Sequence, residues 1–244
     1  MIDLHSHILA GIDDGAKSLS ESIAMAQQSL ESGVSYMVCT PHIHQGVFNN
    51  KLETIKPVFD VLVAEMKKIS LPLKLAYSCE VRLCPEVLQW VTDIQLPYLG
   101  QWDRKALLLL ELPHSHVPPG AENLIKWLLK NRIQPVIPHP ERNRDIIADY
   151  RKAEFLKKLG CLFQITAGAF TGRFSDKVAA TAHRLLKDGY IDYIASDMHS
   201  LNRRPNDMGE AFKVIEKTEG KGTAMKLTTD VPALITKNTR WFSE

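Results

Sequence analysis

Short apolar segments alternate with amphipathic segments along almost the whole chain, and this alternation restricts the fold more than any other feature. The apolar segments have the length and the aliphatic composition of buried strands. We expect seven strands, at residues 2–7, 35–40, 73–79, 106–111, 134–138, 161–166 and 191–196. Strands that alternate with helices predict a parallel sheet.

The first segment between two strands shows the helical signals most completely. Ser18 and Glu21 have the spacing of a capping box, in which the Ser and Glu side chains satisfy backbone amides at the start of a helix. Apolar residues then recur on one helical face, and Gly33 supplies a stop. We therefore expect a helix between residues 18 and 33.

The expected strands are continuous apolar runs, which is typical of strands that are buried on both faces. The sheet could be open and doubly wound, or it could close into a barrel. No GxGxxG motif follows the first strand, and no change of composition marks a linker. We therefore favour one α/β domain over residues 1–244, built as a seven-stranded barrel.

Composition excludes several classes of function. The chain has 30 basic and 28 acidic residues and a net charge of +2, so a nucleic-acid-binding surface is not expected. No apolar run approaches the length of a membrane helix, and no signal peptide is evident, so we expect a cytoplasmic protein. None of the four cysteines is followed by an arginine six positions later, which excludes a cysteine-dependent phosphatase loop.

Histidine or an acidic residue stands at the carboxyl end of six of the seven expected strands; the sixth strand, which contains Gln164 and Thr166, lacks one. In (β/α) barrels the carboxyl ends of the strands meet at one rim, where the active site is built. Two pairs, His5-x-His7 and Asp197-x-His199, add geometry because residues i and i+2 of an extended strand point the same way. The rim residues are His5, His7, His42, Glu80, Glu111, His139, Asp197 and His199.

This donor set indicates a metal centre. Imidazole nitrogen and carboxylate oxygen without thiolate suit Zn, Mn or Fe. So many ligands exceed what one ion can bind, so two or three divalent ions are implied, and neighbouring ions can clamp a phosphoryl group. Other histidines have weaker claims: His114 and His116 lie in a loop beyond Glu111, His183 lies in a helical segment, and His44 is a substrate-side candidate.

These residues make the chain similar to the PHP (polymerase and histidinol phosphatase) superfamily. Within it, the chain resembles bacterial manganese-dependent protein-tyrosine phosphatases encoded with capsule and exopolysaccharide genes. The resemblance covers nearly the whole chain. It rests on residues 1–7 (MIDLHSH), Asp13-Asp14-Gly15, Thr40-Pro41-His42, Glu80, Glu111, Pro138-His139-Pro140-Glu141-Arg142 and Ala195-Ser196-Asp197-Met198-His199.

The resemblance implies a distorted seven-stranded, TIM-like (β/α) barrel that holds three metal ions, Mn rather than Fe or Zn. It adds Asp14, which alone would pass for an ordinary Asp-Gly turn. Carried over by position, one ion would bind His5, His7, Glu80 and Asp197; a second would bind His42, Glu80 and His139; and Asp14, Glu111 and His199 would complete a third site.

The resemblance also implies a reaction and a partner. A hydroxide bridging two ions would attack the phosphorus of phosphotyrosine, and Arg142 would grip the phosphate, with Arg204 as a second contact. The protein substrate would be the tyrosine-rich tail of a cognate autokinase that controls polysaccharide export.

Two other functions remain open from the sequence. One is a phosphatase of the same superfamily that acts on a small metabolite such as histidinol phosphate. The other is a regulator that binds phosphotyrosine without hydrolysing it and uses metals only for structure, although its complete set of ligands argues against this. A nuclease-like function, as in the polymerase-associated relatives, is disfavoured by the near-neutral charge.

Overall fold

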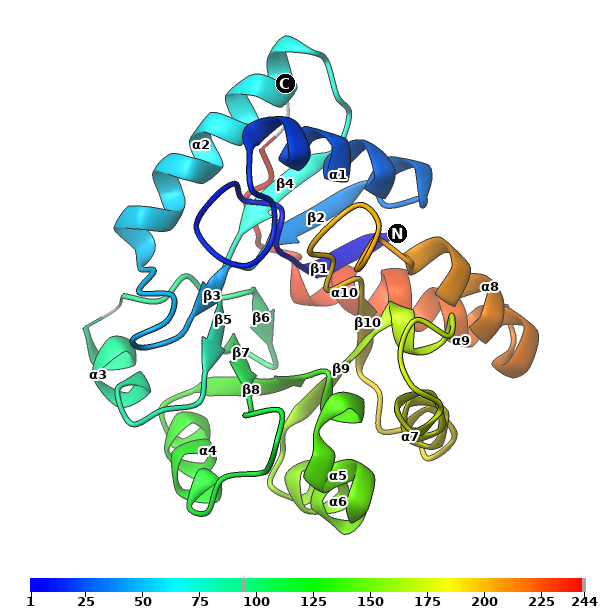
Figure 1. The fold of residues 1–244 in the computed structure, drawn as a ribbon. Coiled ribbons are helices and arrows are strands. Elements are labelled where there is room, and N and C mark those ends of the chain that lie inside the picture. The colour runs from blue at the N-terminus through cyan, green and yellow to red at the C-terminus, as the bar shows by residue number, and fades with distance from the viewer. Residues whose placement is uncertain (94, 243–244) are drawn as a thin grey trace.

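Strands surround a common centre and helices lie outside them in the computed structural model, which describes residues 1–93 and 95–242 (Figure 1). The strands are β1 (Ile2–Ser6), β2 (Tyr36–Cys39), β3 (His42–Ile43), β4 (Lys74–Tyr77), β5 (Glu80–Arg82), β6 (Gln101–Trp102), β7 (Lys105–Glu111), β8 (Ile133–Pro138), β9 (Leu162–Thr166) and β10 (Tyr193–Ala195). The helices are α1 (Leu19–Glu31), α2 (Leu52–Lys68), α3 (Val87–Thr92), α4 (Ala121–Lys130), α5 (Arg144–Ala148), α6 (Arg151–Lys158), α7 (Asp176–Lys187), α8 (Met208–Glu219), α9 (Lys221–Met225) and α10 (Val231–Ile235). Short 3₁₀ turns at Pro140–Arg142 and Ala167–Ala169 follow β8 and β9, and a π turn at Lys226–Asp230 precedes α10.

All seven predicted strands are confirmed, but two of them extend beyond an interruption. The second strand stops at Cys39 and resumes at His42 as β3, and the third stops at Tyr77 and resumes at Glu80 as β5. Pro41, which has no amide hydrogen for a strand ladder, lies in the first gap. The short strand β6, antiparallel to β7, was not predicted.

The strands pair in parallel, as predicted, but they form two sheets within the described residues. The smaller sheet has the order β1-β2-β4, and the larger has the order β10-β9-β8-β7-β5-β3, with β6 at the side of β7. The expectation of one closed barrel sheet is therefore not met: the interruptions at residues 40–41 and 78–79 divide the ladder. The architecture is a mixed α/β fold of parallel strands covered by helices.

The edges of the two sheets nevertheless meet just beyond β1 and β10. The amide of His7 donates to the carbonyl of Met198 at 2.9 Å, and the amide of Asp197 donates to the carbonyl of His5 at 2.9 Å. These bonds hold the His5-x-His7 and Asp197-x-His199 pairs side by side.

The aliphatic run of β7 explains why its sequence does not alternate in polarity. Leu108 and Leu110 pack in the core that lies against the helices, whereas Leu107 and Leu109 belong to a second apolar cluster between the strands. That inner cluster draws side chains from seven strands and from α10, which supplies Val231 and Ile235. Both faces of the strand are buried, as expected for a parallel sheet.

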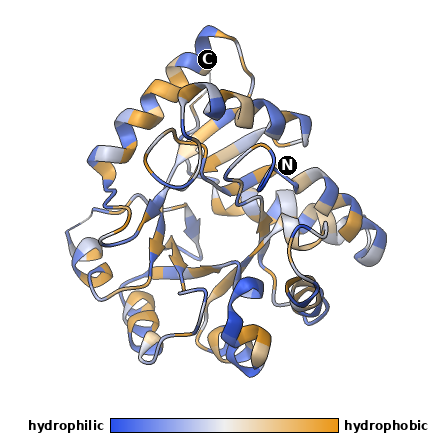
Figure 2. Ribbon diagram, viewed as in Figure 1, coloured by the Kyte–Doolittle hydropathy of each residue, from blue (hydrophilic) through white to orange (hydrophobic). Residues whose placement is uncertain are grey.

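The helices are amphipathic, with hydrophilic and hydrophobic residues side by side on each (Figure 2). Half of the predicted capping box is present at α1: the Ser18 side chain accepts the amide of Glu21, whereas the Glu21 carboxylate accepts the amide of Lys17 and not that of Ser18. The helix ends before Gly33, as predicted. Among the described residues, no helix combines the length and the apolar character that crossing a membrane requires.

Replacing Leu109 with alanine should lower the free energy of unfolding by about 2–5 kcal/mol, because the side chain is fully buried in the inner cluster and its loss leaves a cavity. Chemical denaturation measures the change. Leu88→Ala is the matched control, since Leu88 is 40% exposed and its truncation should cost about 0.5 kcal/mol or less. Equal costs for the two variants would contradict a packed interior.

Candidate metal centre

All nine predicted ligand residues come together at the carboxyl ends of the strands. His5 lies on β1 and His7 just past it, Asp14 follows in the next loop, and His42 and Glu80 begin β3 and β5. Glu111 ends β7, His139 follows β8, and Asp197 and His199 follow β10. Residues separated by up to 194 positions thus share one site, as the strand-end argument predicted.

The tightest group consists of His5, His7, Glu80 and Asp197. Nε2 of His5 lies 3.0 Å from Nε2 of His7, 3.3 Å from Oε2 of Glu80 and 3.4 Å from Oδ1 of Asp197. Nε2 of His7 lies 3.5 Å from each of the same two oxygens. Ligands about 2.1 Å from one ion in a tetrahedron lie about 3.4 Å apart, so these four atoms have the spacing of a coordination shell.

A second group gathers around Asp14. Oδ1 of Asp14 lies 3.4 Å from Nε2 of His42 and 3.4 Å from Nε2 of His199. The nearby ring of His7 places a fourth donor atom within reach of the same position.

Glu111 lies on the other side of the site, which differs from the grouping that the resemblance implied. Its carboxylate is 4.0 Å from Nε2 of His139 and 3.9 Å from Nδ1 of His42. Glu80 lies between, with Oε1 2.9 Å from Nε2 of His139 and Oε2 2.9 Å from Nδ1 of His42. Asp14 and His199 therefore group with His7 and His42, whereas Glu111 groups with His114 and His139 and also with His42 and Glu80.

Hydrogen bonds behind the histidines fix which nitrogen faces the centre. Nδ1 of His5 bonds the side-chain oxygen of Gln164 at 2.8 Å, and Nδ1 of His7 bonds Oδ2 of Asp13 at 2.8 Å. Nδ1 of His199 bonds the carbonyl of Asp197 at 3.0 Å. Because each Nδ1 donates its proton outward to an oxygen, each Nε2 turns a lone pair inward, as in metal-binding histidines.

Asp13 and Gln164 are functional positions that the sequence reasoning missed. Asp13 also accepts the amides of Gly15 and His42, so it joins the loop after β1 to the start of β3. The Asp13-Asp14-Gly15 segment could have indicated this residue, but the resemblance implied a ligand role for Asp14 alone. Gln164 occupies the one strand end that lacked a ligand: strand β9 supplies an orienting group in place of a donor.

Several buried polar atoms in the site have no hydrogen-bond partner among the described residues. They include Oε2 of Glu80, Oε2 of Glu111, Oδ1 of Asp197 and Nε2 of His199, and all four face the cluster. Buried acceptors are almost always satisfied, so a converging set of them calls for an electron-pair acceptor such as a cation. The residues present therefore fit divalent metal ions.

The pKa shifts follow from crowded carboxylates and burial. Burial and the neighbouring Glu80 carboxylate raise the pKa of Glu111 to about 7. Burial opposes a charge on His5 as well, but Glu80 and Asp197 outweigh it and raise its pKa to about 9. A positive charge is thus favoured at the point where these side chains meet.

Two of the histidines are held neutral. Burial and the Arg142 guanidinium lower the pKa of His139 to about 3. Burial and His7 lower the pKa of His199 to about 4. Neutral imidazole is the form that binds metal, so both rings are available as ligands at neutral pH.

Both predicted phosphate-binding arginines contact the site through Asp197. Nη1 of Arg142 donates to Oδ2 of Asp197 at 2.7 Å, and Nη2 of Arg204 donates to the same oxygen. The Arg142 guanidinium also lies over the ring of Phe174, 5.0 Å from its centroid. The two cations therefore lie immediately beside the metal-type donors.

The backbone is unusual at two of the predicted ligands. His139 and Asp197 have φ values of 38° and 51°, in the left-handed region that residues other than glycine seldom adopt. His139 directly follows β8, and Asp197 lies two residues beyond the end of β10. Such strained turns occur preferentially at functional sites. Gly15 is required for a different reason: a Cβ there would lie 1.9 Å from the carbonyl oxygen of His7.

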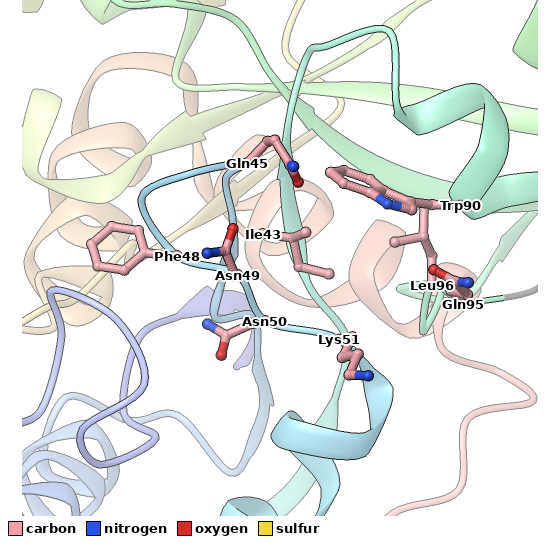
Figure 3. Close-up of a pocket in the computed structure, with 9 residues that line it drawn as sticks. All are labelled: Ile43, Gln45, Phe48, Asn49, Asn50, Lys51, Trp90, Gln95 and Leu96. Atoms are coloured by element: carbon pink, nitrogen blue, oxygen red, sulfur yellow. The ribbon is translucent and has the colours of Figure 1, made fainter.

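The site is closed at its base and open at its rim. His5 and Glu80 are fully buried, whereas the side chain of Asp14 is 52% exposed. The loop between β3 and α2 borders the rim, and its Phe48 ring stacks on His42 with centroids 5.5 Å apart. Figure 3 shows Phe48 on the opposite side of this loop from Trp90. Among the described residues of the site, the exposed side chain of Asp14 marks the rim as the side open to a substrate.

Of the weaker histidine candidates, His114 belongs to the site. Its Nε2 lies 3.1 Å from Nη2 of Arg142, its Nδ1 lies 3.6 Å from Glu111, and its ring stacks on His139. Arg82, which the sequence did not single out, has Nε 3.1 Å from Glu111. His44 lines the same hollow as Arg82 and His114. The other two histidines lie elsewhere: His116 contacts Ser115 in an exposed loop, and His183 packs edge-on against Phe170.

Comparison with known proteins identifies relatives over the whole chain. Residues 1–237 match the family described as capsular polysaccharide synthesis, CpsB/CapC. The tyrosine-protein phosphatase YwqE of Bacillus subtilis is 35% identical over 98% of this chain and 93% of its own length. The tyrosine-protein phosphatase CpsB of Streptococcus pneumoniae is 31% identical over 96% of this chain and 98% of its own length.

Solved structures agree with the sequence comparison. A crystal structure from work on B. subtilis YwqE and S. pneumoniae CpsB, described as unique metal-dependent tyrosine phosphatases, superposes with a TM-score of 0.85 at 34% identity, over 98% of this chain and 92% of that one. A β-aspartyl dipeptidase from Fervidobacterium islandicum superposes with a TM-score of 0.58 at 18% identity, which shows a shared fold alone. By the match along residues 1–237 and these full-length relatives, the chain belongs to the CpsB/CapC family of capsular polysaccharide synthesis.

Proposed function

We propose that this chain is a divalent-metal-dependent protein-tyrosine phosphatase. One observation carries the proposal: buried acceptor atoms of four residues, which make no hydrogen bond among the described residues, converge beside two guanidinium groups. Such a centre holds cations next to phosphate-binding donors. The full-length relatives named as tyrosine-protein phosphatases support the choice of phosphotyrosine as substrate.

The donor atoms support three metal positions. The first uses His5, His7, Glu80 and Asp197, and the second uses Glu80, Glu111 and His139. The third uses Asp14, His42 and His199. In this assignment Glu80 would contribute to the first two positions, and Glu111 exchanges places with His42 relative to the sets that the resemblance implies. A nitrogen and oxygen donor set without thiolate suits Mn, which we propose as the ion over Fe or Zn.

Bound divalent ions would supply charge neutralisation for the phosphoryl group and would lower the pKa of the water that attacks it. Side chains of the protein itself would bind the phosphoryl group. Arg142 and Arg204 can each offer planar pairs of N–H donors to phosphoryl oxygens, a geometry that suits a dianion. A tyrosinate leaving group has a pKa near 10 and needs little protonation, so catalysis makes little demand on a general acid.

We also propose that residues 1–244 fold as a single domain in the form of a distorted seven-stranded barrel. The backbone bonds that join residues 5–7 to residues 197–198 support closure between β1 and β10. The inner apolar cluster, to which seven strands contribute, supports a filled interior like that of a (β/α) barrel.

For the cell, we propose a cytoplasmic enzyme that acts on the phosphorylated tail of a cognate bacterial tyrosine kinase. The match to a family of capsular polysaccharide synthesis supports a partner in that process. Neither a nucleic acid nor insertion into a membrane is part of this proposal, in keeping with the near-neutral net charge.

The function is tested by removing metal with a chelator and restoring Mn²⁺. Phosphate release from a phosphotyrosine peptide should fall to background after chelation and return with Mn²⁺, because the acceptor atoms of the site would otherwise lack cations. Histidinol phosphate, assayed in parallel, should be hydrolysed far more slowly. Faster release from histidinol phosphate would favour the metabolite phosphatase, and tight phosphopeptide binding without turnover would favour the regulator.

Replacing Asp13 with asparagine should weaken metal binding about 10- to 100-fold, because the variant removes the carboxylate that orients His7 and increases its basicity. Titration of metal-free protein with Mn²⁺ by calorimetry measures the change. Asp93→Asn, at an exposed carboxylate that bonds only Gln89 and Gln95, is the matched control. Unchanged affinity in Asp13→Asn would remove the orienting role.

Replacing Arg142 with alanine should reduce kcat/KM for phosphotyrosine peptide about 100-fold or more while metal content is retained. The guanidinium neutralises Asp197, so its removal leaves that carboxylate more negative and no weaker as a ligand. Elemental analysis of the purified variant, alongside its kinetics, separates the two effects. Loss of metal together with activity would show that Arg142 holds the centre and not the phosphate.

A further inference from the structure

A cationic hollow opens directly beside the metal centre, and neither the donor sets nor the phosphate-binding arginines account for it. It has a volume of about 570 Å³ and lies between the loop after β3, the end of β5 and the loop after β7. Its basic lining residues are His44, Arg82, His114 and Arg144. None of the described residues that line it is acidic.

The hollow and the metal centre share walls. His114 lines the hollow and also contacts Arg142 and Glu111, and Arg82 lines the hollow with its Nε 3.1 Å from Glu111. A group bound in the hollow would therefore lie next to the rim from which a phosphorylated side chain enters. A peptide whose phosphotyrosine occupies the centre would pass its neighbouring residues over this surface.

The two guanidinium groups retain donors for a ligand. Arg82 uses Nη1 to donate to the carbonyl of Leu112, while its Nη2 makes no hydrogen bond within residues 1–93 and 95–242. Arg144 is exposed, and its side chain has no ion pair among the described residues. The adjacent carboxylate of Asp145 is engaged with Lys152 and the amide of Val117, so it does not neutralise Arg144.

The walls of the hollow are fixed by the fold. The amide of Arg144 donates to the carbonyl of His114 at 2.9 Å. Nδ2 of Asn143 donates to the carbonyls of Pro113 and His116 at 2.8 and 3.1 Å. The segment after β8 thus holds the loop after β7 in place, and the position of Arg144 relative to His114 does not depend on a ligand.

We propose that this hollow is a specificity subsite for a negatively charged group of the substrate chain next to the phosphotyrosine. The inference rests on the proposed function and deepens it. The ligand chemistry is an anionic oxygen group, either the carboxylate of a flanking Asp or Glu or the phosphoryl group of a second phosphotyrosine. Arg144 and Arg82 bind this group, and Arg144 is the residue that can be changed without touching Glu111.

Three peptides of equal length test the subsite on the full chain loaded with Mn²⁺. One has a single phosphotyrosine with neutral neighbours, the second has glutamates on both sides, and the third has a second phosphotyrosine nearby. The protein should prefer at least one anionic peptide over the neutral one by about fivefold in kcat/KM, the upper end for a partly exposed ion pair. The preference should decline as salt is added.

The variants assign the preference to one side chain. Arg144→Glu should abolish or invert it through like-charge repulsion, and Arg144→Lys should retain most of it. Arg151→Glu is the matched control: Arg151 is exposed, pairs with Asp149 and does not line the hollow, so its reversal should leave the preference intact. A preference that is lost equally in Arg144→Glu and Arg151→Glu would reflect net charge and would overturn the subsite.

A binding measurement separates failure of the subsite from failure of the proposed function. The same peptides, carrying a non-hydrolysable phosphonate in place of each phosphate, are titrated by fluorescence anisotropy. Equal binding and equal turnover of neutral and anionic peptides would overturn the subsite while the phosphatase function stands. Absence of turnover with any peptide would overturn the proposed phosphatase function. In that case the subsite would still be tested by whether the protein binds the anionic phosphonate peptides more tightly than the neutral one, and whether Arg144→Glu removes that difference.

Discussion

The carboxylate of Asp197 is almost completely buried and faces two opposite environments. Oδ1 points toward Nε2 of His5 and His7, and Oδ2 accepts hydrogen bonds from Arg142 and Arg204. A buried charge is costly unless it is paired, and here the pairing extends from the metal-type donors to the guanidinium groups of Arg142 and Arg204. Because one side chain joins both, the spacing between the metal positions and the guanidinium groups is fixed by the protein and not by the substrate.

The convergence of donor atoms in the site depends on the orientation of its histidine rings. Asp13, Gln164 and the carbonyl of Asp197 each bond an Nδ1, and these contacts place three Nε2 lone pairs in one small volume. Gln164 lies on β9, the only predicted strand whose end lacks a ligand. Strand β9 therefore contributes a side chain that orients a neighbouring ligand instead of contributing a ligand itself.

Bringing these side chains together requires strained backbone conformations. Left-handed φ values at His139 and Asp197, each of order 1 kcal/mol or more, are retained because strand pairing on one side and packing on the other fix the turns. Gly15 lets the loop after β1 pass so close to His7 that no larger residue would fit. The same loop brings Asp13 and Asp14 to opposite faces of the site.

The sequence by itself determined the kind of fold and the membership of the site. Apolar runs at strand spacing and donors at strand ends are local patterns, and the i, i+2 pairs carry their geometry within a single strand. Only the tertiary structure decided how the donors are shared: Glu111 lies near His42, Glu80 and His139, while Asp14 lies near His42 and His199. That partition depends on the breaks that separate β2 from β3 and β4 from β5, and on side-chain directions across different strands. Local patterns also could not predict the contacts of His114, Arg82 and Gln164 in the site, because each of these residues contacts a residue that is distant in sequence.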